Sequence, residues 1–200
     1  MSPTVFVVDD DEAMRDSLAQ LLESAGLRVE IHADGATFLA AYDADRSGCL
    51  LLDMAMPGMT GLEVQAALKE RGLEIPIVFL TGHGDIPLAV KAVQCGAVDF
   101  LEKPVQGAVL IDRVQRALKL DEEWRKTQLH ILEIHQRHAR LSKREKEVMA
   151  LAVAGLTSKE IGRDLGISPR TVEVHRTHVM HKMAAANVAE LVSMAAYCNA

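Results

Sequence analysis

The sequence predicts two folds in one chain, an α/β doubly wound domain followed by an all-α domain. Three observations support this. Over residues 1–119 of the 200, short β-branched runs alternate with amphipathic helical runs, as in successive βαβ units. Residues 120–139 are polar, contain no glycine or proline, and suit a helical linker. Residues 140–200 show helical patterns only, separated by glycines and helix-capping residues.

Five parallel strands are expected in the first domain, because right-handed crossovers place strands side by side with helices on both faces of the sheet. The strand-like runs are 4–8, 27–31, 49–52, 75–80 and 98–101. The first helical run ends at Gly26. The other four cover 35–42, 61–71, 86–95 and 107–120.

The linker carries an apolar seam whose members recur three and four positions apart. They are Ala117, Leu120, Trp124, Thr127, Ile131, Ile134, His138 and Leu141. This heptad pattern fits a helix that packs against its own domain, and it also fits a linker helix that dimerises. The sequence leaves both interpretations open.

Four helices are expected in the all-α domain. Ser142 and Glu145 form a capping-box pattern at the start of the first helix. A short second helix over 157–165 is followed by Ser168 and Pro169, an N-cap and a first-turn proline that open the third helix. Two short helices joined in this way form a helix-turn-helix pattern. The other boundaries are marked by Gly155, Gly166, Met183 and Asn187.

The composition excludes several classes of protein. Hydrophobic residues make up 49% of the chain and charged residues 25%, which is too apolar for a disordered polymer. Three cysteines without paired spacing argue against a disulfide framework or a zinc ribbon and favour a reducing, cytoplasmic location. No apolar run reaches the roughly 18 residues of a membrane span, and the start lacks the basic region of a signal peptide.

The formal net charge of −6 is unevenly distributed. Residues 1–119 carry 10 Lys and Arg against 18 Asp and Glu, whereas residues 120–200 carry 12 against 10. Within 139–183 the balance is 9 basic to 5 acidic. The net charge alone would argue against a nucleic-acid partner. The split instead predicts an acidic first domain and a basic surface on the second.

Five polar residues follow or close four of the expected strands: Asp9, Asp10, Asp53, Thr81 and Lys103. Ligands of open α/β sheets bind at this carboxyl edge. Clustered carboxylates repel one another unless a cation is bound, and an oxygen-only donor set suits Mg²⁺. A carboxylate nucleophile at Asp53, together with Mg²⁺, a lysine and a hydroxyl, can form an acyl phosphate. The pattern therefore predicts a phosphoryl-transfer site.

In their order along the chain, four motifs resemble the CheY-like receiver domain of two-component response regulators. They are Val8-Asp9-Asp10, Asp53-Met-Ala-Met-Pro-Gly58, Thr81-Gly82 and Glu102-Lys103-Pro104. The resemblance implies that Asp53 accepts phosphate from the phosphohistidine of a sensor histidine kinase. It further implies that the peptide bond before Pro104 is cis.

The resemblance also implies a role for each residue of the pocket. Asp10, Asp53 and the backbone carbonyl of Ala55 would bind Mg²⁺, and Asp9 would hold a metal-bound water. Mg²⁺ is thus the implied cofactor. Thr81 and Lys103 would hold the phosphoryl oxygens. Phe100 would be the switch aromatic, which turns inward as Thr81 moves.

The second part of the chain resembles the LuxR-type helix-turn-helix over about residues 139–199. The matching stretches are Leu141-Ser-Lys-Arg-Glu, Gly155-Leu-Thr-Ser-Lys-Glu-Ile161 and Leu165-Gly-Ile-Ser-Pro-Arg-Thr-Val-Glu-Val-His-Arg176. With the receiver, this similarity indicates the FixJ/NarL group. Two departures affect the expected helix packing and phosphate contacts: Gly162 stands where alanine is common, and Ala184-Ala-Ala-Asn187 replaces a more polar turn.

The third helix of this part is expected to enter the major groove of DNA. Glu173, Val174 and Thr177 share one helix face and are the expected base readers, because Glu accepts from a cytosine amine and Val contacts a thymine methyl. Phosphate contacts, which supply affinity and register, are expected from Lys159, Arg170, Thr171, Arg176, His178 and Lys182.

Two functions are compared. The first is a phosphorylation-gated transcription regulator, not a turnover enzyme, whose phosphorylated receivers dimerise so that two tethered DNA-binding domains reach a two-fold-related promoter site. RNA polymerase is a further candidate partner, and no membrane partner is expected. The alternative is a haloacid-dehalogenase-like, Mg²⁺-dependent phosphatase with Asp9 as nucleophile and Asp11 as acid. The alternative leaves the helix-turn-helix unexplained.

Overall fold

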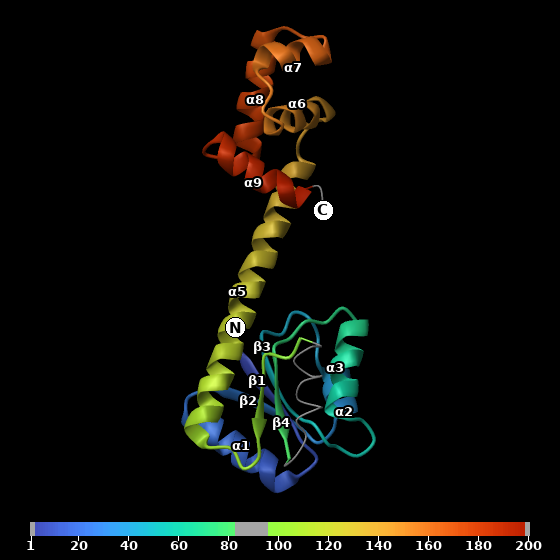
Figure 1. Cartoon of the computed structure of the whole chain (residues 1–200), viewed down its shortest axis with the longest axis vertical. Helices are drawn as coiled ribbons and strands as arrows, with labels where there is room; N and C mark the ends of the chain where they lie inside the picture. Colours follow the sequence, from blue (N-terminus) through green and yellow to red (C-terminus); the bar gives the residue numbers. More distant parts are fainter. Residues whose placement is uncertain (1–2, 83–95, 199–200) are drawn as a thin grey trace. The chain divides into compact units, whose positions relative to one another are not determined.

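The fold is taken from a computed structural model, which describes residues 3–82 and 96–198 (Figure 1). The chain divides into two compact units, Met1–Arg125 and Lys126–Ala200. Each unit is described by itself. The expected helix over 86–95 lies outside the described residues.

The first unit is built on a five-stranded parallel sheet in the order β2-β1-β3-β4-β5. The strands are β1 Thr4–Val8, β2 Arg28–His32, β3 Gly48–Asp53, β4 Ile77–Thr81 and β5 Asp99–Glu102. The doubly wound parallel sheet predicted from the sequence is confirmed, and the strand limits differ from the expected ones by at most two residues.

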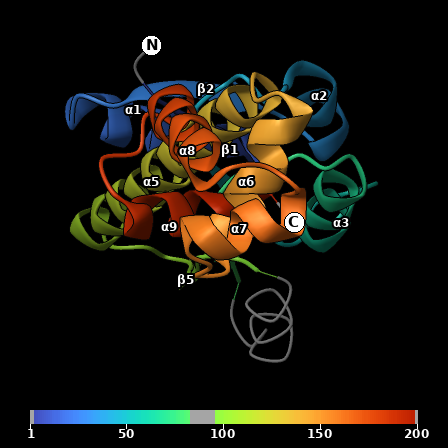
Figure 2. The ribbon, with the colours of Figure 1, turned by 90° about the horizontal axis from the view of Figure 1, so that it is seen from above.

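Alternate residues of the strands face two separate hydrophobic clusters. Phe6 and Val8 of β1 pack with helices α2 (Gly35–Ala41) and α3 (Gly61–Glu70), where Phe79 of β4 also lies. Val5 and Val7 pack with α1 (Glu12–Ser24) and the first part of α5 (Gly107–Ala139). The two pairs of helices therefore lie on opposite faces of the sheet, as Figure 2 shows.

The last helix of the first unit and the linker form one continuous helix, α5, over Gly107–Ala139. We expected two elements meeting near residue 120, but no glycine or proline interrupts the helix there. The apolar seam divides along it. Ala117 is buried in the first unit, and Ile134 and Leu141 are buried in the second. Packing within the chain thus accounts for both ends of the seam, whereas Trp124 between them is 38% exposed.

The start of β3 is bonded to α5. Asp121, 2% exposed, accepts from the backbone N–H of Gly48 at 2.9 Å and from Nε of Arg125 at 2.9 Å. The guanidinium of Arg125 also donates to the carbonyls of Ala44 and Arg46, at 2.8 and 2.7 Å. These bonds join the first unit to α5 beyond the limit of residue 119 that we expected for its domain.

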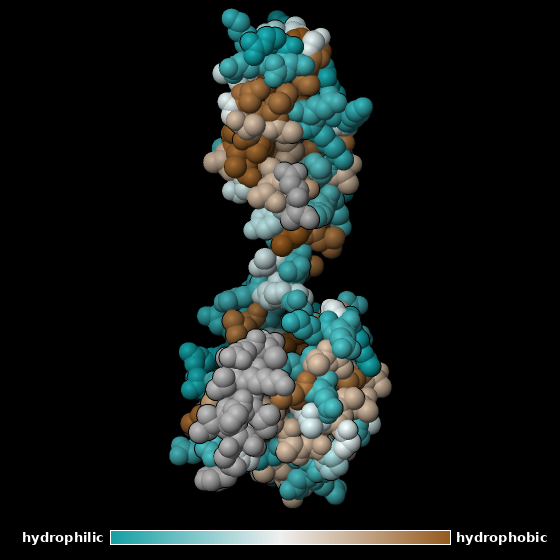
Figure 3. Space-filling model, turned by 45° about the vertical axis from the view of Figure 1, so that its right-hand side comes forward, coloured by the Kyte–Doolittle hydropathy of each residue, from teal (hydrophilic) through white to brown (hydrophobic). Residues whose placement is uncertain are grey.

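The second unit contains the end of α5 and four helices, α6 Lys143–Val153, α7 Ser158–Leu165, α8 Pro169–Met183 and α9 Val188–Cys198. The expected capping box is present, because Ser142 and Glu145 bond each other's backbone N–H groups. Ser168 caps α8 as expected, and Pro169 is its first residue. Apolar side chains also reach the surface of this unit (Figure 3), among them Val174, Val188, Val192 and Tyr197.

Candidate functional site

The polar residues predicted at the strand ends meet at the carboxyl edge of the sheet. Asp9 follows β1, Asp53 ends β3 and Thr81 ends β4, and these three residues are at most 5% exposed. Lys103 follows β5 and is half-buried. Since the strands are parallel and adjacent in the order β1-β3-β4-β5, their ends converge at one place.

Lys103 joins the two buried carboxylates. Its Nζ lies 2.7 Å from Oδ2 of Asp9 and 2.5 Å from Oδ1 of Asp53. The other oxygen of Asp53 accepts from the backbone N–H of Ala55 at 2.9 Å. The backbone N–H of Lys103 donates to the carbonyl of Thr81 at 2.8 Å, and the following bond to Pro104 is cis, as expected. The ammonium is thereby held between two carboxylates.

The charges in this pocket shift one another. Burial raises the pKa of the Asp53 carboxyl. The hydrogen bond from Lys103 opposes this rise, and the negative charge of Asp9 adds to it. Burial by itself would lower the pKa of the Lys103 ammonium, but its bonds to Asp53 and Asp9 outweigh that effect, and its pKa is raised. The Lys103 side chain therefore stays charged. Its charge only partly offsets the free-energy cost of ionising the buried Asp53 carboxyl.

Asp10 and Ala55 are exposed at the same edge. Within the described residues, the carboxylate of Asp10 has no hydrogen-bond or ion-pair partner. No group of three His, Cys, Asp or Glu side chains in the described ranges is already arranged to hold a metal ion. The candidate metal donors at this edge are nevertheless all oxygens. One of them belongs to Asp53, a buried carboxyl with a raised pKa, and additional positive charge would stabilise its ionised form. This donor set fits Mg²⁺.

Phe100, the expected switch aromatic, lies in β5 and is 42% exposed. The expected helix over 86–95, which precedes β5 in the chain, lies outside the described residues.

One residue near the pocket was missed in the sequence analysis. Nη1 of Arg15, in α1, donates to the backbone carbonyls of Asp9 and Asp10, at 2.8 and 2.9 Å. The available signal was an arginine one helical turn after the helix-capping Asp11. Spacing alone did not indicate that its side chain turns back onto the acidic residues.

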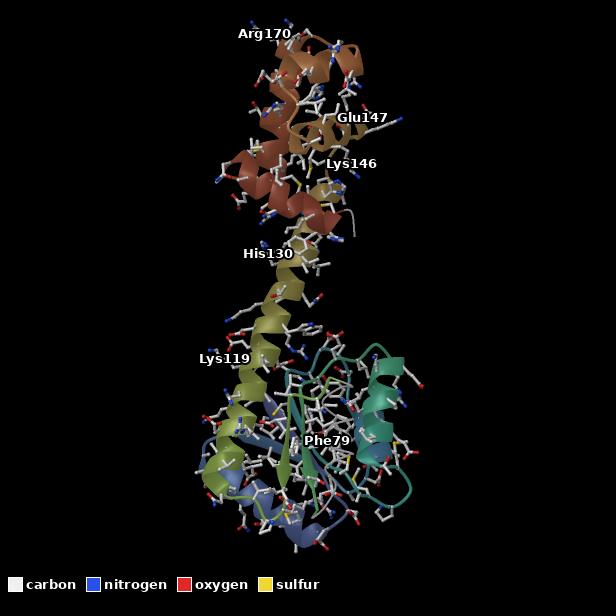
Figure 4. The ribbon with its side chains drawn as sticks, viewed as in Figure 1. Phe79, Lys119, His130, Lys146, Glu147 and Arg170 are labelled. Atoms are coloured by element: carbon white, nitrogen blue, oxygen red, sulfur yellow. The ribbon has the colours of Figure 1, made fainter. Side chains whose placement is uncertain are left out.

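Helix α8 contains most of the expected DNA contacts. Val174, an expected base reader, is 50% exposed. Arg170 lies at the first turn of α8, at the free end of the helix in Figure 4. Of the other expected contacts on α7 and α8, Arg176 is half-buried, and the exposed ones are Lys159, Thr171, Glu173, Thr177, His178 and Lys182.

The polar base readers have intramolecular partners. A carboxylate oxygen of Glu173 bonds the hydroxyl of Ser158, the first residue of α7. The hydroxyl of Thr177 donates to the backbone carbonyl of Glu173 at 2.9 Å. Ser158 was not predicted as a site residue, because nothing in its own position along the chain indicates contact with a residue fifteen positions later.

Lys182 has a partner that the sequence analysis did not anticipate. Its Nζ donates to Oε2 of Glu145 at 2.7 Å, and Nδ1 of His178 lies 3.7 Å from the other oxygen. Glu145 is 3% exposed. The hydrogen bond from Lys182, with that from the backbone of Ser142, lowers the pKa of Glu145 to about 2. Lys182 thus ties α8 to α6, which weakens its interpretation as a phosphate contact.

The two departures from the LuxR-type pattern have visible structural counterparts. A Cβ at Gly162 would lie 2.7 Å from the carbonyl oxygen of Ile167, so α7 approaches the turn more closely than alanine allows. Ala184, which ends α8, has a φ of 54° and is the one non-glycine residue with positive φ among the described residues. This conformation is unfavourable for a residue with a side chain.

A five-stranded α/β unit with aspartates and a lysine at one sheet edge, followed by a helix-turn-helix unit, is the architecture of a response regulator. The family model of the response regulator receiver domain matches residues 5–115, and that of the luxR family of bacterial regulatory proteins matches residues 139–195. The chain therefore belongs to the response regulators with a LuxR-type DNA-binding domain, which are transcriptional regulators.

Known regulators are similar to this chain in sequence and structure over nearly its whole length. The transcriptional regulatory protein FixJ of Azorhizobium caulinodans is 50% identical over 192 residues, covering 96% of this chain and 90% of the relative. A structure of the response regulator StyR is 42% identical, with a TM-score of 0.87 and 98% of each chain covered. Full-length FixJ from B. japonicum is 43% identical, with a TM-score of 0.62, covering 100% of this chain and 98% of that one. No helix in the described ranges is both long and apolar enough to span a membrane.

Proposed function

We propose that this regulator is gated by phosphorylation of Asp53 by a sensor histidine kinase. The observation that carries the proposal is the position of Lys103, whose ammonium bridges Asp9 and Asp53 at the carboxyl edge of the sheet. A fixed cation beside a buried carboxylate nucleophile is the arrangement that phosphoryl transfer requires. An oxygen of Asp53 forms the acyl phosphate as the bond to the kinase histidine breaks.

The other residues of the pocket bind and orient the phosphoryl group. Thr81 and Lys103 hold its oxygens, and Lys103 exchanges its bond to Asp53 for one to the phosphoryl group. Mg²⁺, when bound, neutralises charge between the carboxylates and the phosphoryl oxygens. Asp10, Asp53 and the carbonyl of Ala55 would hold this ion, with Asp9 beside them in its hydration.

Phosphorylation is proposed to change the oligomeric state. Phe100 turns inward as Thr81 moves, and the face that includes β5 then favours a receiver dimer. Two tethered DNA-binding units raise each other's effective concentration at a two-fold-related promoter site. The regulator can act on RNA polymerase from that site.

On DNA, α8 is proposed to enter the major groove, with Glu173, Val174 and Thr177 reading bases. Phosphate contacts are assigned to Lys159, Arg170, Thr171, Arg176, His178 and Lys182. The contacts of Lys182 and Lys159 can be compared directly by salt dependence. Loss of one phosphate contact lowers the slope of log affinity against log salt by about 1. We expect this for K159A and a smaller change for K182A, because Lys182 already pairs with Glu145.

The test of gating uses the full chain and D53N, each with and without a small-molecule phosphodonor and Mg²⁺. Phosphate on Asp53, a larger species by light scattering and tighter binding to DNA selected from random sequence are expected for the wild type alone. A D53N protein that gains the same size and affinity on exposure to the phosphodonor would contradict the proposal.

The phosphatase alternative has less support. Its acid would be Asp11, but the carboxylate of Asp11 accepts from the backbone N–H groups of Ala13 and Met14 and caps α1. Repeated turnover of a phosphomonoester by the protein would restore that alternative, whereas one phosphate per chain on Asp53 would dismiss it.

A further inference from the structure

Arg15 bonds three successive backbone carbonyls of the turn that precedes its own helix. This acid turn consists of Asp9, Asp10 and Asp11. The backbone N–H of Arg15 donates to the carbonyl of Asp11 at 3.0 Å. Its Nη1 donates to the carbonyls of Asp9 and Asp10 at 2.8 and 2.9 Å. One residue therefore satisfies every carbonyl oxygen of the acid turn.

The side chains of the acid turn differ in how far they are already bonded. Oδ1 of Asp9 accepts from the backbone N–H of Asp11 at 2.9 Å, and Oδ2 accepts from Lys103. The carboxylate of Asp11 caps α1. The exposed carboxylate of Asp10 has no partner within the described residues. The turn thus presents the open carboxylate of Asp10 from a backbone whose three carbonyls all accept hydrogen bonds.

Two cations serve the pocket in different ways. Lys103 bonds side-chain oxygens of Asp9 and Asp53, which are the groups that take part in the proposed chemistry. Arg15 bonds only backbone oxygens of the acid turn. Backbone carbonyls are themselves ligands for hard cations, so carbonyls held by Arg15 cannot turn toward an ion. The carboxylates are then the oxygens that this turn offers.

We propose that Arg15 is a positioning residue for the Mg²⁺ site, acting through the backbone of the acid turn. The inference rests on the proposed function, which places Mg²⁺ at this edge. Without the Arg15 side chain, the carbonyls of Asp9 and Asp10 lose their common donor, and this part of the turn must be ordered each time the ion binds. Groups behind the direct ligands typically contribute about 10–100-fold to metal affinity.

The direction in which removing Arg15 changes Mg²⁺ affinity distinguishes positioning from simple electrostatics. Arg15 is positively charged, so its removal from an acidic pocket should tighten Mg²⁺ binding if only Coulomb forces act. Loss of positioning should weaken it. A charge effect and a geometric effect therefore predict opposite changes for the same substitution.

The experiment is calorimetric titration of the full chain with Mg²⁺ alone. We expect R15M to raise the Mg²⁺ Kd about tenfold. R15K keeps the charge and an N–H donor, so its Mg²⁺ Kd should lie between those of the wild type and R15M. The matched control is R71M, because Nη1 of Arg71 makes a similar bond to the carbonyl of Leu39 at 2.7 Å, outside the pocket. Its Kd should equal that of the wild type.

A second readout follows the rate of Asp53 phosphorylation by a small-molecule phosphodonor as Mg²⁺ is varied. R15M should need about tenfold more Mg²⁺ for half-maximal rate and reach a similar maximum, a split that a general loss of structure would not give. An R15M protein with unchanged or tighter Mg²⁺ binding overturns the inference.

Two further outcomes are separable. If the wild type gains no phosphate on Asp53 at any Mg²⁺ concentration, the proposed function fails, while calorimetry still decides the role of Arg15. If R15M does not fold, R15K and R15Q are titrated in its place. Wild-type or lower Kd values for both overturn the inference, and a higher Kd for either supports it.

Discussion

The carboxylate of Asp121 holds the backbone N–H of Gly48, 73 positions earlier in the chain, at 2.9 Å. Gly48 begins β3, and Asp121 lies in α5 beyond the end we had assigned to the first domain. Arg125 is bonded to both oxygens of the same carboxylate. Asp121 and Arg125 are therefore bonded into the first compact unit, which extends to Arg125.

Replacing Asp121 with alanine should lower the unfolding free energy of the first unit by about 3 kcal/mol, since it leaves Arg125 and a buried N–H without their shared partner. Urea unfolding followed by fluorescence of Trp124, the single tryptophan, measures this. The control is E123A. Glu123 is 3.8 Å from Lys119 in an exposed pair, and its loss should change stability by less than about 0.5 kcal/mol.

Replacing Asp53 with asparagine should raise the melting temperature when Mg²⁺ is absent. The folded-state pKa of Asp53 is raised, so its stabilising contribution is complete below the unfolded-state pKa and is lost as pH rises through the folded value. At neutral pH the ionised group therefore destabilises the fold, and D53N removes it. Scanning calorimetry of D53N and of D45N, a change at an exposed aspartate, tests this. A lower melting temperature for D53N than for D45N contradicts the argument.

The second unit should lose stability in acid because of Glu145. Its pKa is lowered from 4.5 to about 2, so its contribution is present above about pH 4.5 and is lost as pH falls toward 2. E145Q and K182A should both flatten this dependence, measured from NMR amide signals of α6 and α8 during urea unfolding. E133Q, at a surface glutamate paired with Arg137, is the control. If K182A keeps the full wild-type slope, the pair with Lys182 is not its cause.

Replacing Ala184 with glycine should stabilise the second unit by about 0.5–1 kcal/mol, because glycine adopts the observed φ of 54° without steric cost. Ala154 offers a matched control, since it also ends a helix but has a φ of −71°. A154G should destabilise the unit. Equal effects of the two substitutions in urea unfolding would rule out backbone strain at Ala184.

Ser158 should sharpen the base preference of Glu173. Its hydroxyl occupies one carboxylate oxygen and leaves the other to accept from a cytosine amine. S158A should reduce discrimination at that base pair by about 1 kcal/mol and leave the salt dependence unchanged. S193A, which removes a hydroxyl bonded within α9, is the control. Binding to a set of single-base variants of the selected site measures both, and unchanged discrimination in S158A excludes this role.

Much of the fold could be predicted because its signals are local. Strand periodicity, glycine stops and capping pairs such as Ser142 with Glu145 depend on neighbouring residues. The order of Asp9, Asp53 and Lys103 relative to the strands was likewise enough to place them at one edge. The continuity of α5 was missed because a change in composition was treated as a structural boundary.

What could not be predicted depends on contacts between distant residues. Lys182 has the sequence context of a phosphate contact, and its pairing with Glu145 exists only once α6 and α8 are packed. The bonds from Arg15 and Asp121 to backbone groups leave no trace in side-chain patterns, because any residue supplies the same carbonyl or N–H.

Strand β3 has consequences for how the molecule bears mechanical load. Its last residue is Asp53, and its first, Gly48, is bonded to Asp121. A pull or twist on the part of α5 that lies in the first unit therefore reaches the strand that carries the proposed phosphoacceptor through the carboxylate of Asp121, as well as through the packing of Val114 and Ala117 on the sheet. Tension in the helix and chemistry at Asp53 act on opposite ends of the same six-residue segment.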